Sequence, residues 1–259
     1  MSLDRKTPQL TARSVLASVL LGTDPPWLPT RLLVRTAEVF GISEGTARTA
    51  LSRMVTAGEA ETVRGGYQLI GRLVVRQDRQ LASRRAVTLP WDGTWELAAV
   101  DADGSRPAAD RAALREALYQ LRLVELREGL WGRPDNLEPS RSPAASAVVA
   151  TWCRWWRGAR PDPAPEVGPL WDLDGWAARA EELRDEMLAL LLPLEDDDRR
   201  ALAAGFVTSA DVLRHLQADA LLPPELLPPG WPGDALRTEY DRYDRAYRAV
   251  LRGWLAEAP

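Results

Sequence analysis

The sequence has few of the residues on which catalytic and metal chemistry most often depends. Its 259 residues include one cysteine, Cys153, and one histidine, His215, which lie 62 positions apart. A disulfide within the chain is therefore excluded, and a single cysteine is consistent with a reducing compartment. A catalytic triad, a Cys/His dyad and a histidine-ligated zinc site have no support from this inventory. We expect no enzymatic activity, no catalytic residue and no metal site.

The sequence also lacks a long apolar run, a secretory signal and a glycine-rich phosphate-binding loop. A bilayer-spanning helix needs roughly 20 apolar residues, whereas the most apolar stretch, residues 187–194, ends in a proline and an acidic run. The first ten residues carry charges but no apolar segment of a signal peptide. Neither Gly-x-Gly-x-x-Gly nor Gly-x4-Gly-Lys occurs. We expect a cytoplasmic protein that needs no membrane and no cofactor.

Charge is distributed unevenly along the chain, although the net charge is only −4. Residues 1–85 carry 13 basic and 7 acidic side chains, a net charge of +6, whereas residues 86–259 carry 20 and 30, a net charge of −10. Lys6 is the single lysine, so the basic character comes from arginine. A basic N-terminal module on an acidic body indicates that this module meets a polyanion, although charge alone does not establish DNA binding.

Three amphipathic helices are predicted in the first 57 residues. Residues 11–21 have apolar side chains at helical spacing and are followed by Gly22, which ends the helix. Pro29 opens a second helix, and Ser43 is a cap for a third over residues 44–57. The third helix directs Ala47, Ala50, Leu51, Met54 and Val55 toward a core and leaves an opposite face of small polar and basic side chains. That face carries Thr46, Arg48, Thr49, Ser52 and Arg53.

A short β-hairpin follows these helices. Residues 61–63 and 67–70 are β-prone and are separated by Arg64-Gly65-Gly66, where glycine supplies the positive φ of a tight turn. Three helices followed by a hairpin predict a winged helix-turn-helix, with residues 44–57 in the major groove and Arg64 against the DNA backbone. The exposed face could also be an ordinary solvated surface, or the domain a protein-interaction module. Residues 71–85 form a further basic helix that either touches DNA or links to the next domain.

The stretch Leu20 to Arg85 resembles the PaaX family, bacterial repressors of phenylacetic acid degradation. The specific segments are FGISEGTARTALSRM, residues 40–54, and the Gly-Tyr-x-Leu-x-Gly-Arg sequence at residues 66–72. Residues 91–95 (WDGTW) and 221–233 (LLPPELLPPGWPG) are similar to later elements of that family. The resemblance implies a homodimeric transcriptional repressor of phenylacetate catabolism. It would bind a double-stranded DNA operator with an inverted repeat and be released by an acyl-CoA effector of the phenylacetyl-CoA kind.

The rest of the chain predicts an α+β protein of three domains. The middle region is predicted to contain a strand, a helix, two strands and a final helix over residues 144–157. This order of elements indicates a ferredoxin-like (split βαβ) domain. The proline-rich segment 160–165 is a stiff linker, and the remaining segments are helical, with separate helices expected from residue 196 and over residues 209–220. We therefore expect a winged helix-turn-helix at 1–86, an α+β domain at 87–165 and an all-helical domain for dimerisation or effector binding at 166–259.

Two clusters in the middle domain are candidate sites. Three tryptophans and two arginines would suit an acyl group and CoA phosphates, or would pack as an aromatic helix between domains. These residues are Trp152, Arg154, Trp155, Trp156 and Arg157. The family resemblance also likens this domain to the small nuclease of CRISPR adaptation, which would make Asp101 and Asp103 metal ligands. Two solvated turn carboxylates are the alternative, because no partner histidine or acidic cluster accompanies them.

Overall fold

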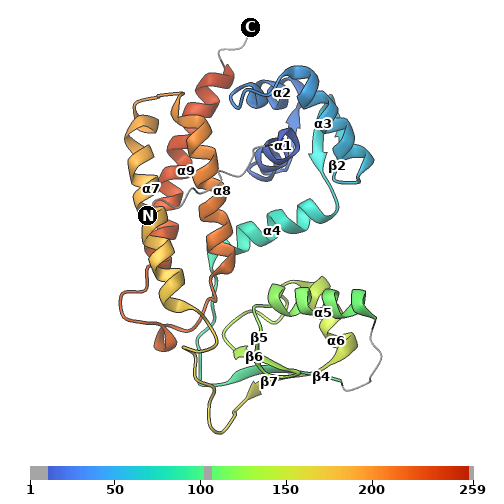
Figure 1. Cartoon of the computed structure of the whole chain (residues 1–259), viewed down its shortest axis with the longest axis vertical. Coiled ribbons are helices and arrows are strands. Elements are labelled where there is room, and N and C mark those ends of the chain that lie inside the picture. Colours follow the sequence, from blue (N-terminus) through green and yellow to red (C-terminus); the bar gives the residue numbers. More distant parts are fainter. Residues whose placement is uncertain (1–10, 102–106, 257–259) are drawn as a thin grey trace, which may run out of the picture. The chain divides into compact units, whose positions relative to one another are not determined.

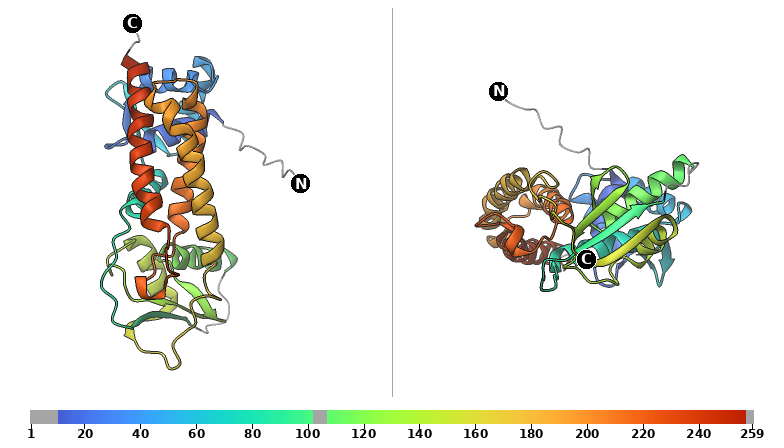
Figure 2. Two further views of the ribbon diagram at one scale, coloured as in Figure 1. Left: turned by 90° about the vertical axis from the view of Figure 1, so that its left-hand side faces the viewer. Right: turned by 90° about the horizontal axis from the view of Figure 1, so that it is seen from below.

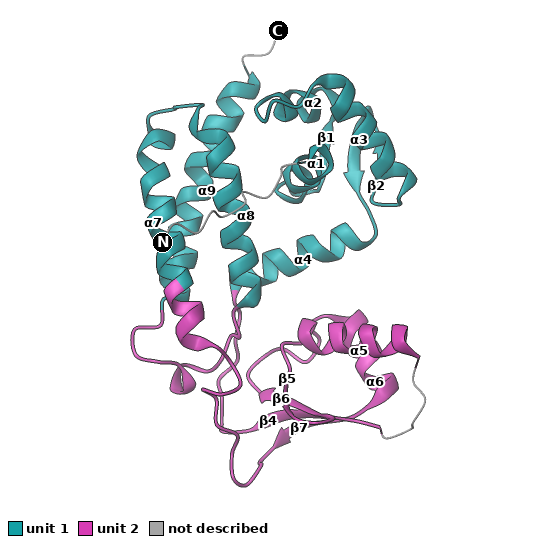
Figure 3. Cartoon of the chain, in the orientation of Figure 1, with its two compact units in different colours: residues 1–85, 179–218, 232–259 teal, residues 86–178, 219–231 magenta. Residues whose placement is uncertain are grey.

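The computed structural model describes residues 11–101 and 107–256 (Figure 1). The chain divides into two compact units, which are shown in Figure 3. Unit 1 is formed by the described parts of residues 1–85, 179–218 and 232–259, and unit 2 by those of residues 86–178 and 219–231. Unit 1 thus contains the segment predicted to be the N-terminal domain together with most of the helical C-terminal segment. The functional division into three domains remains a prediction.

The N-terminal part of unit 1 consists of four helices and a small antiparallel sheet. The predicted helices over 11–21, 44–57 and 71–85 are confirmed to within one residue at each end, and so is the predicted hairpin. An additional short strand precedes the second helix and pairs with the hairpin, so that the strand order is β1-β3-β2. The elements are α1 (Ala12–Leu21), β1 (Trp27–Pro29), α2 (Thr30–Glu38), α3 (Glu44–Thr56), β2 (Ala60–Val63), β3 (Gly66–Leu69) and α4 (Arg72–Arg85).

Three long helices lie side by side in the C-terminal part of the chain (Figures 1 and 2). They are α7 (Leu173–Glu195), α8 (Ala201–Ala218) and α9 (Gly233–Ala256), with a short 3-10 turn, η1 (Pro224–Leu226), before the last. The prediction of two helices between residues 196 and 220 is wrong. Thr208 is buried within the continuous α8, and the hydroxyl group of Ser209 lies 2.8 Å from that of Tyr240 instead of capping a new helix. Within the described ranges, no helix has the length and apolar character to cross a bilayer.

Helices α8 and α9 approach each other closely at Gly205. The Tyr243 hydroxyl group donates a hydrogen bond of 2.8 Å to the Gly205 carbonyl oxygen. A Cβ atom at Gly205 would lie 3.0 Å from both the Tyr243 hydroxyl oxygen and Tyr247 Cδ2. Glycine therefore allows these two tyrosine rings to pack directly on the α8 backbone.

The helix that follows the hairpin is joined to this helical part of unit 1. The Arg84 guanidinium lies 4.9 Å from the Tyr240 ring centroid and forms ion pairs of 2.6 Å with Asp241 and 3.1 Å with Asp244. Phe40 contacts Phe206 edge to face, with ring centroids 4.8 Å apart. The C-terminal end of α4 is thus anchored on α9, while its N-terminal end remains beside the hairpin.

Unit 2 contains a four-stranded antiparallel sheet with two helices against one face. The strand order is β5-β6-β4-β7, so that the first and third strands along the chain are neighbours in the centre. Ala98, Trp131 and Cys153 point toward the helices and pack with Leu118 and Val149. The elements are β4 (Trp95–Val100), α5 (Ala108–Gln120), β5 (Val124–Arg127), β6 (Leu130–Pro134), α6 (Pro143–Trp152) and β7 (Cys153–Ala159).

The predicted helix over residues 144–157 is correct only up to Trp152. From Cys153 onward the chain is strand β7, paired with β4 in a register that places Trp155 opposite Ala98 and Trp156 opposite Leu97. Residues 153–157 satisfy a helical pattern equally well in isolation. The free edge of β4 decides the outcome, because its backbone N–H and C=O groups need partners.

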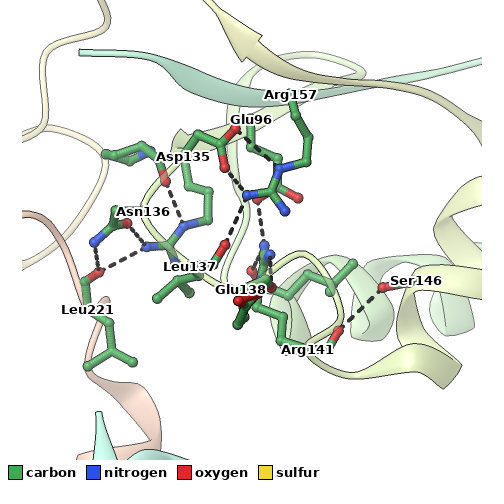
Figure 4. A network of polar contacts seen from close by, with 12 residues as sticks. Glu96, Asp135, Asn136, Leu137, Glu138, Arg141, Ser146, Arg157 and Leu221 are labelled. Carbon is green, nitrogen blue, oxygen red and sulfur yellow. Dashed lines mark hydrogen bonds and ion pairs between the residues drawn. The ribbon is translucent and has the colours of Figure 1, made fainter. Parts of the chain in front are cut away.

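A buried polar network joins residues 220–221 to strand β6 (Figure 4). The Arg133 guanidinium is fully buried and donates to the carbonyl oxygens of Pro134, Ala220 and Leu221 at 2.9–3.2 Å and to Asn136 Oδ1 at 2.7 Å. Asn136 Nδ2 donates a further bond of 3.0 Å to the Leu221 carbonyl oxygen. Arg133 thus holds the segment after α8 by main-chain carbonyl groups, and burial lowers its pKa well below the usual value.

The contact at Gly205 leads to a stability prediction. Gly205→Ala is expected to destabilise the protein by about 1–3 kcal/mol, the range for overpacking, because the added methyl group would press on Tyr243 and Tyr247. Gly253→Ala is the matched control, since it is also a helical glycine but has open space around it; it should stabilise by up to about 1 kcal/mol. Urea unfolding of the two variants gives the comparison. Equal effects would contradict the role given to Gly205.

Candidate nucleic-acid interface

Helix α3 separates its buried and exposed residues as the sequence predicts. Ala47, Leu51 and Met54 are fully buried in the core of the N-terminal part, and the five predicted contact residues are all exposed. Val55 differs from the prediction, since it is 38% exposed and is not part of this core. The contact residues, which are Thr46, Arg48, Thr49, Ser52 and Arg53, therefore share one solvent-facing surface of a single helix.

The polar side chains in the first turns of α3 are short and form hydrogen bonds within this segment. Ser43 caps the helix by accepting a hydrogen bond of 3.3 Å from the Thr46 amide group, and its hydroxyl group lies 2.9 Å from Thr46 Oγ1. The Thr49 hydroxyl group donates to the Gly45 carbonyl oxygen at 2.8 Å. Small side chains held in this way allow a helix backbone to come close to base edges in a major groove.

The two arginines of this face differ in their local partners. Arg48 Nε forms an ion pair of 2.7 Å with Glu44 one turn earlier, and both side chains are more than half exposed. Arg53 forms no ion pair or hydrogen bond with any described residue through its side chain. Arg53 can therefore bind an anion without first leaving a protein partner. Arg48 would have to give up its ion pair with Glu44 to do so.

Arg64 occupies the tip of the hairpin in an unusual backbone conformation. Val63 pairs with Gly66, so Arg64 and Gly65 form a two-residue turn, with φ of 49° and 74°. Positive φ at both positions is the requirement of the type I′ hairpin turn, where asparagine and glycine are preferred. The Thr30 hydroxyl group and amide N–H bond to the Gly65 carbonyl oxygen at 3.0 and 3.2 Å, which fixes the turn beside α2.

A shallow groove runs along the exposed face of α3. Its volume is about 490 Å³, and α1 contributes Thr11, Ala12 and Arg13 to its wall. From α3 it is lined by Gly45, Thr46, Thr49, Ala50 and Arg53. Polar and basic side chains predicted for DNA contact therefore border the groove together with Arg13, which the sequence pattern did not single out.

Glu59 links the groove to the fold. Its carboxylate is 1% exposed and accepts bonds from Arg13 Nε and Nη2 at 2.8 and 2.5 Å and from Arg72. These bonds hold the pKa of Glu59 down to about 2, with the Arg13 hydrogen bonds as the main cause. Glu59 lies 46 residues after Arg13 and 13 residues before Arg72. Because these distances exceed any local repeat, the sequence pattern did not indicate the interaction among the three residues.

The predicted effector residues are divided between the last residue of α6, Trp152, and the two faces of β7. Trp152 and Trp155 pack against the helix-covered core, and Arg157 bonds with Asp135 and with the Leu137 carbonyl oxygen at 2.9 Å. Arg154 and Trp156 lie two residues apart on the opposite face and are exposed. The structure thus does not gather the five residues into one site.

The remaining candidates lie away from this surface. Asp101 is exposed and lies 3.5 Å from Arg154 Nε, and Asp103 lies outside the described residues. His215 is half-buried in the last turn of α8. The part of the chain that the structure describes contains no group of three or more histidine, cysteine, aspartate or glutamate residues arranged to hold a metal ion.

Comparison with known proteins agrees with this geometry. The family described as "PaaX-like protein" matches residues 11–73, and the family described as "PaaX-like protein C-terminal domain" matches residues 171–256. A solved structure, "Uncharacterized protein Rv0674 from Mycobacterium tuberculosis", is 38% identical with a TM-score of 0.72 and covers 94% of this chain and 98% of its own. No curated protein matches the chain.

These matches define the class as transcription regulators that bind DNA. Within that class, the chain belongs to the PaaX family.

The Glu59 pair predicts a specific dependence of stability on pH. Glu59→Gln should lower the free energy of unfolding at pH 7 by about 1–2 kcal/mol, because the variant loses both ion pairs. The loss is smaller than the lowered pKa of Glu59 alone would give, because solvent around the exposed Arg13 and Arg72 weakens these pairs. Since the folded pKa is depressed, the wild-type contribution is complete above about pH 4.5 and is lost as the pH falls toward 2. Denaturant unfolding between pH 7 and pH 2.5 gives the measurement.

The matched control is Glu61→Gln, which removes an exposed carboxylate from strand β2, two residues after Glu59. This variant should show the same dependence of the free energy of unfolding on pH as the wild type. A Glu59→Gln profile parallel to that of the wild type over this pH range would contradict the assignment.

Proposed function

We propose that this protein is a DNA-binding transcriptional repressor of the PaaX type. Residues 11–85 would act as a winged helix-turn-helix in which α3 enters the major groove and Arg64 contacts the flanking backbone. The observation that carries this proposal is the exposed face of α3, with two arginines and three small hydroxyl side chains above a buried core. Arginine recognises guanine through O6 and N7, and hydroxyl groups bond to bases or phosphates.

The protein would act as a cytoplasmic homodimer on an inverted repeat. Two copies related by twofold symmetry would place two α3 helices on half-sites about one or more DNA turns apart. The long helices of the C-terminal segment would provide dimerisation or effector binding. The middle region would be a ferredoxin-like domain, which the antiparallel order β5-β6-β4-β7 and the helices on one face support.

The proposed inducer is an acyl-CoA thioester of the phenylacetyl-CoA kind. Arg154 and Trp156 support a contribution from the open face of β7, because an exposed guanidinium suits a phosphate and an exposed indole suits an aryl group. Trp152, Trp155 and Arg157 would act indirectly, through the packing of β7. Inducer binding would favour a dimer whose α3 helices no longer match the half-site spacing.

Arginine variants test the DNA-reading surface. Arg53→Ala and Arg48→Ala should each weaken binding to a cognate duplex obtained by selection from genomic fragments, and at least one should lower the ratio of cognate to scrambled affinity. One lost bidentate base contact corresponds to about 1–3 kcal/mol, or roughly 5- to 150-fold. Gel-shift titration at fixed salt gives both affinities. Unchanged binding in both variants would exclude α3 as the reader.

Arg200→Ala is the control for these variants, since its side chain is 92% exposed and pairs locally with Asp198. It removes one positive charge from unit 1 away from the α3 surface. Its affinity for the cognate duplex should equal that of the wild type.

Thermal shifts test the effector. Phenylacetyl-CoA should raise the melting temperature, whereas free CoA and phenylacetate should not. Trp156→Ala and Arg154→Ala should reduce the shift, and Tyr119→Ala should retain it, since Tyr119 is an exposed aromatic residue on α5. A shift unaffected by either β7 variant would exclude this face, and no shift with any thioester would exclude the ligand class.

A further inference from the structure

A second basic surface lies beside α3, on three helices that are distant in sequence. Arg13 at the beginning of α1, Arg76 in the first half of α4 and Arg214 near the end of α8 are close enough for their charges to interact. Arg72, Arg76 and Arg79 recur along one side of α4 at spacings of four and three residues. Positive charge from α1, α4 and α8 thus converges on Arg76.

Arg76 has no compensating acidic partner. Its side chain forms no ion pair or hydrogen bond with any residue in 11–101 or 107–256, and the residue is exposed. Burial, followed by repulsion from the guanidiniums of Arg214, Arg13 and Arg79, lowers its pKa. A protein usually places a carboxylate beside a cation that has other cations as neighbours, because repulsion disfavours the charged form.

The acidic groups of this region are already engaged by other arginines. Glu59 accepts bonds from Arg13 and Arg72, and Asp211 lies 2.6 Å from Arg214 Nη1. Asp78 on α4 is exposed and pairs with none of the described residues. The two carboxylates that bond to neighbouring arginines, Glu59 and Asp211, therefore do not pair with Arg76.

The basic surface is continuous with the groove on α3 through Arg13. The Arg13 guanidinium bonds to Glu59 on one side, while its side chain lines the groove opposite Arg53 and Thr49. About half of the Arg13 side chain remains exposed. Arg13 therefore belongs both to the groove on α3 and to the group of arginines around Arg76.

We propose that Arg76, together with Arg13, binds a backbone phosphate of the DNA that flanks the bases read by α3. This inference rests on the proposed function. It adds a contact from the helix after the wing, which would position the duplex without reading its sequence. The phosphodiester supplies the negative charge that the protein does not provide at Arg76. Arg84, one of the two arginines in the last turn of α4, is occupied by α9 and is not part of this surface.

The salt dependence of DNA binding tests this contact in the full-length protein. Each phosphate contact contributes about 0.9 to the slope of log K against log salt concentration. Arg76→Ala should reduce the slope by about one contact and weaken cognate and scrambled duplexes alike, by about twofold to fivefold, as for an exposed ion pair. Arg76→Lys should restore most of the slope, because a lysine retains the charge. The proposal fails if Arg76→Ala leaves the slope unchanged while Arg53→Ala weakens cognate binding.

Further measurements distinguish a DNA phosphate contact at Arg76 from a general effect of charge and from a site for a free anion. Arg245→Ala removes an exposed arginine of α9 and should leave the slope unchanged. If the wild type binds no DNA, the proposed function itself is wrong, which is distinguishable from a failure at Arg76 alone. A melting shift with millimolar inorganic phosphate that needs Arg76, with no change in the DNA salt slope, would assign the site to a free anion and overturn the DNA contact.

Discussion

The buried Glu59 carboxylate is the interaction on which the N-terminal part of unit 1 depends. Its side chain joins α1 to α4 through Arg13 and Arg72, and its backbone bonds to the end of α3 and to the residue after β3. One residue thus fixes the position of α3 relative to the hairpin and to the helices on either side. A buried carboxylate without these two arginines would be strongly disfavoured, so the charge and the geometry depend on each other.

Local patterns were sufficient wherever a segment folds by its own periodicity. Ala47, Leu51 and Met54 repeat at helical spacing, Ser43 caps the helix that they define, and Gly65 marks the turn of the hairpin. These features need no information from the rest of the chain, and the structure agrees with them to within a residue or two. The exposed residues of α3 followed as the complement of the buried ones.

Features that depend on distant partners were not accessible in the same way. Residues 153–157 form a strand because β4 offers a free edge, and α8 is continuous because Tyr240 of α9 engages Ser209. The carbonyl groups of Ala220 and Leu221 bond to Arg133 almost 90 residues earlier. Arg13 and Arg76 gain their significance only when α1, α4 and α8 come together. The periodicity of a sequence indicates which side of a helix is buried, but it does not indicate which other helix packs against that side.

The backbone of Arg64 adopts a conformation at the tip of the hairpin that favours smaller residues. An L-residue with a long side chain costs free energy at a φ of 49°, whereas glycine or asparagine would occupy this turn with less strain. A sequence selected for stability alone would place a smaller residue there. The arginine at this position keeps a charged side chain exposed at the turn. If Arg64 contacts DNA as proposed, this position would drift toward glycine once selection for that contact ceased, and the protein would become more stable as it lost its activity.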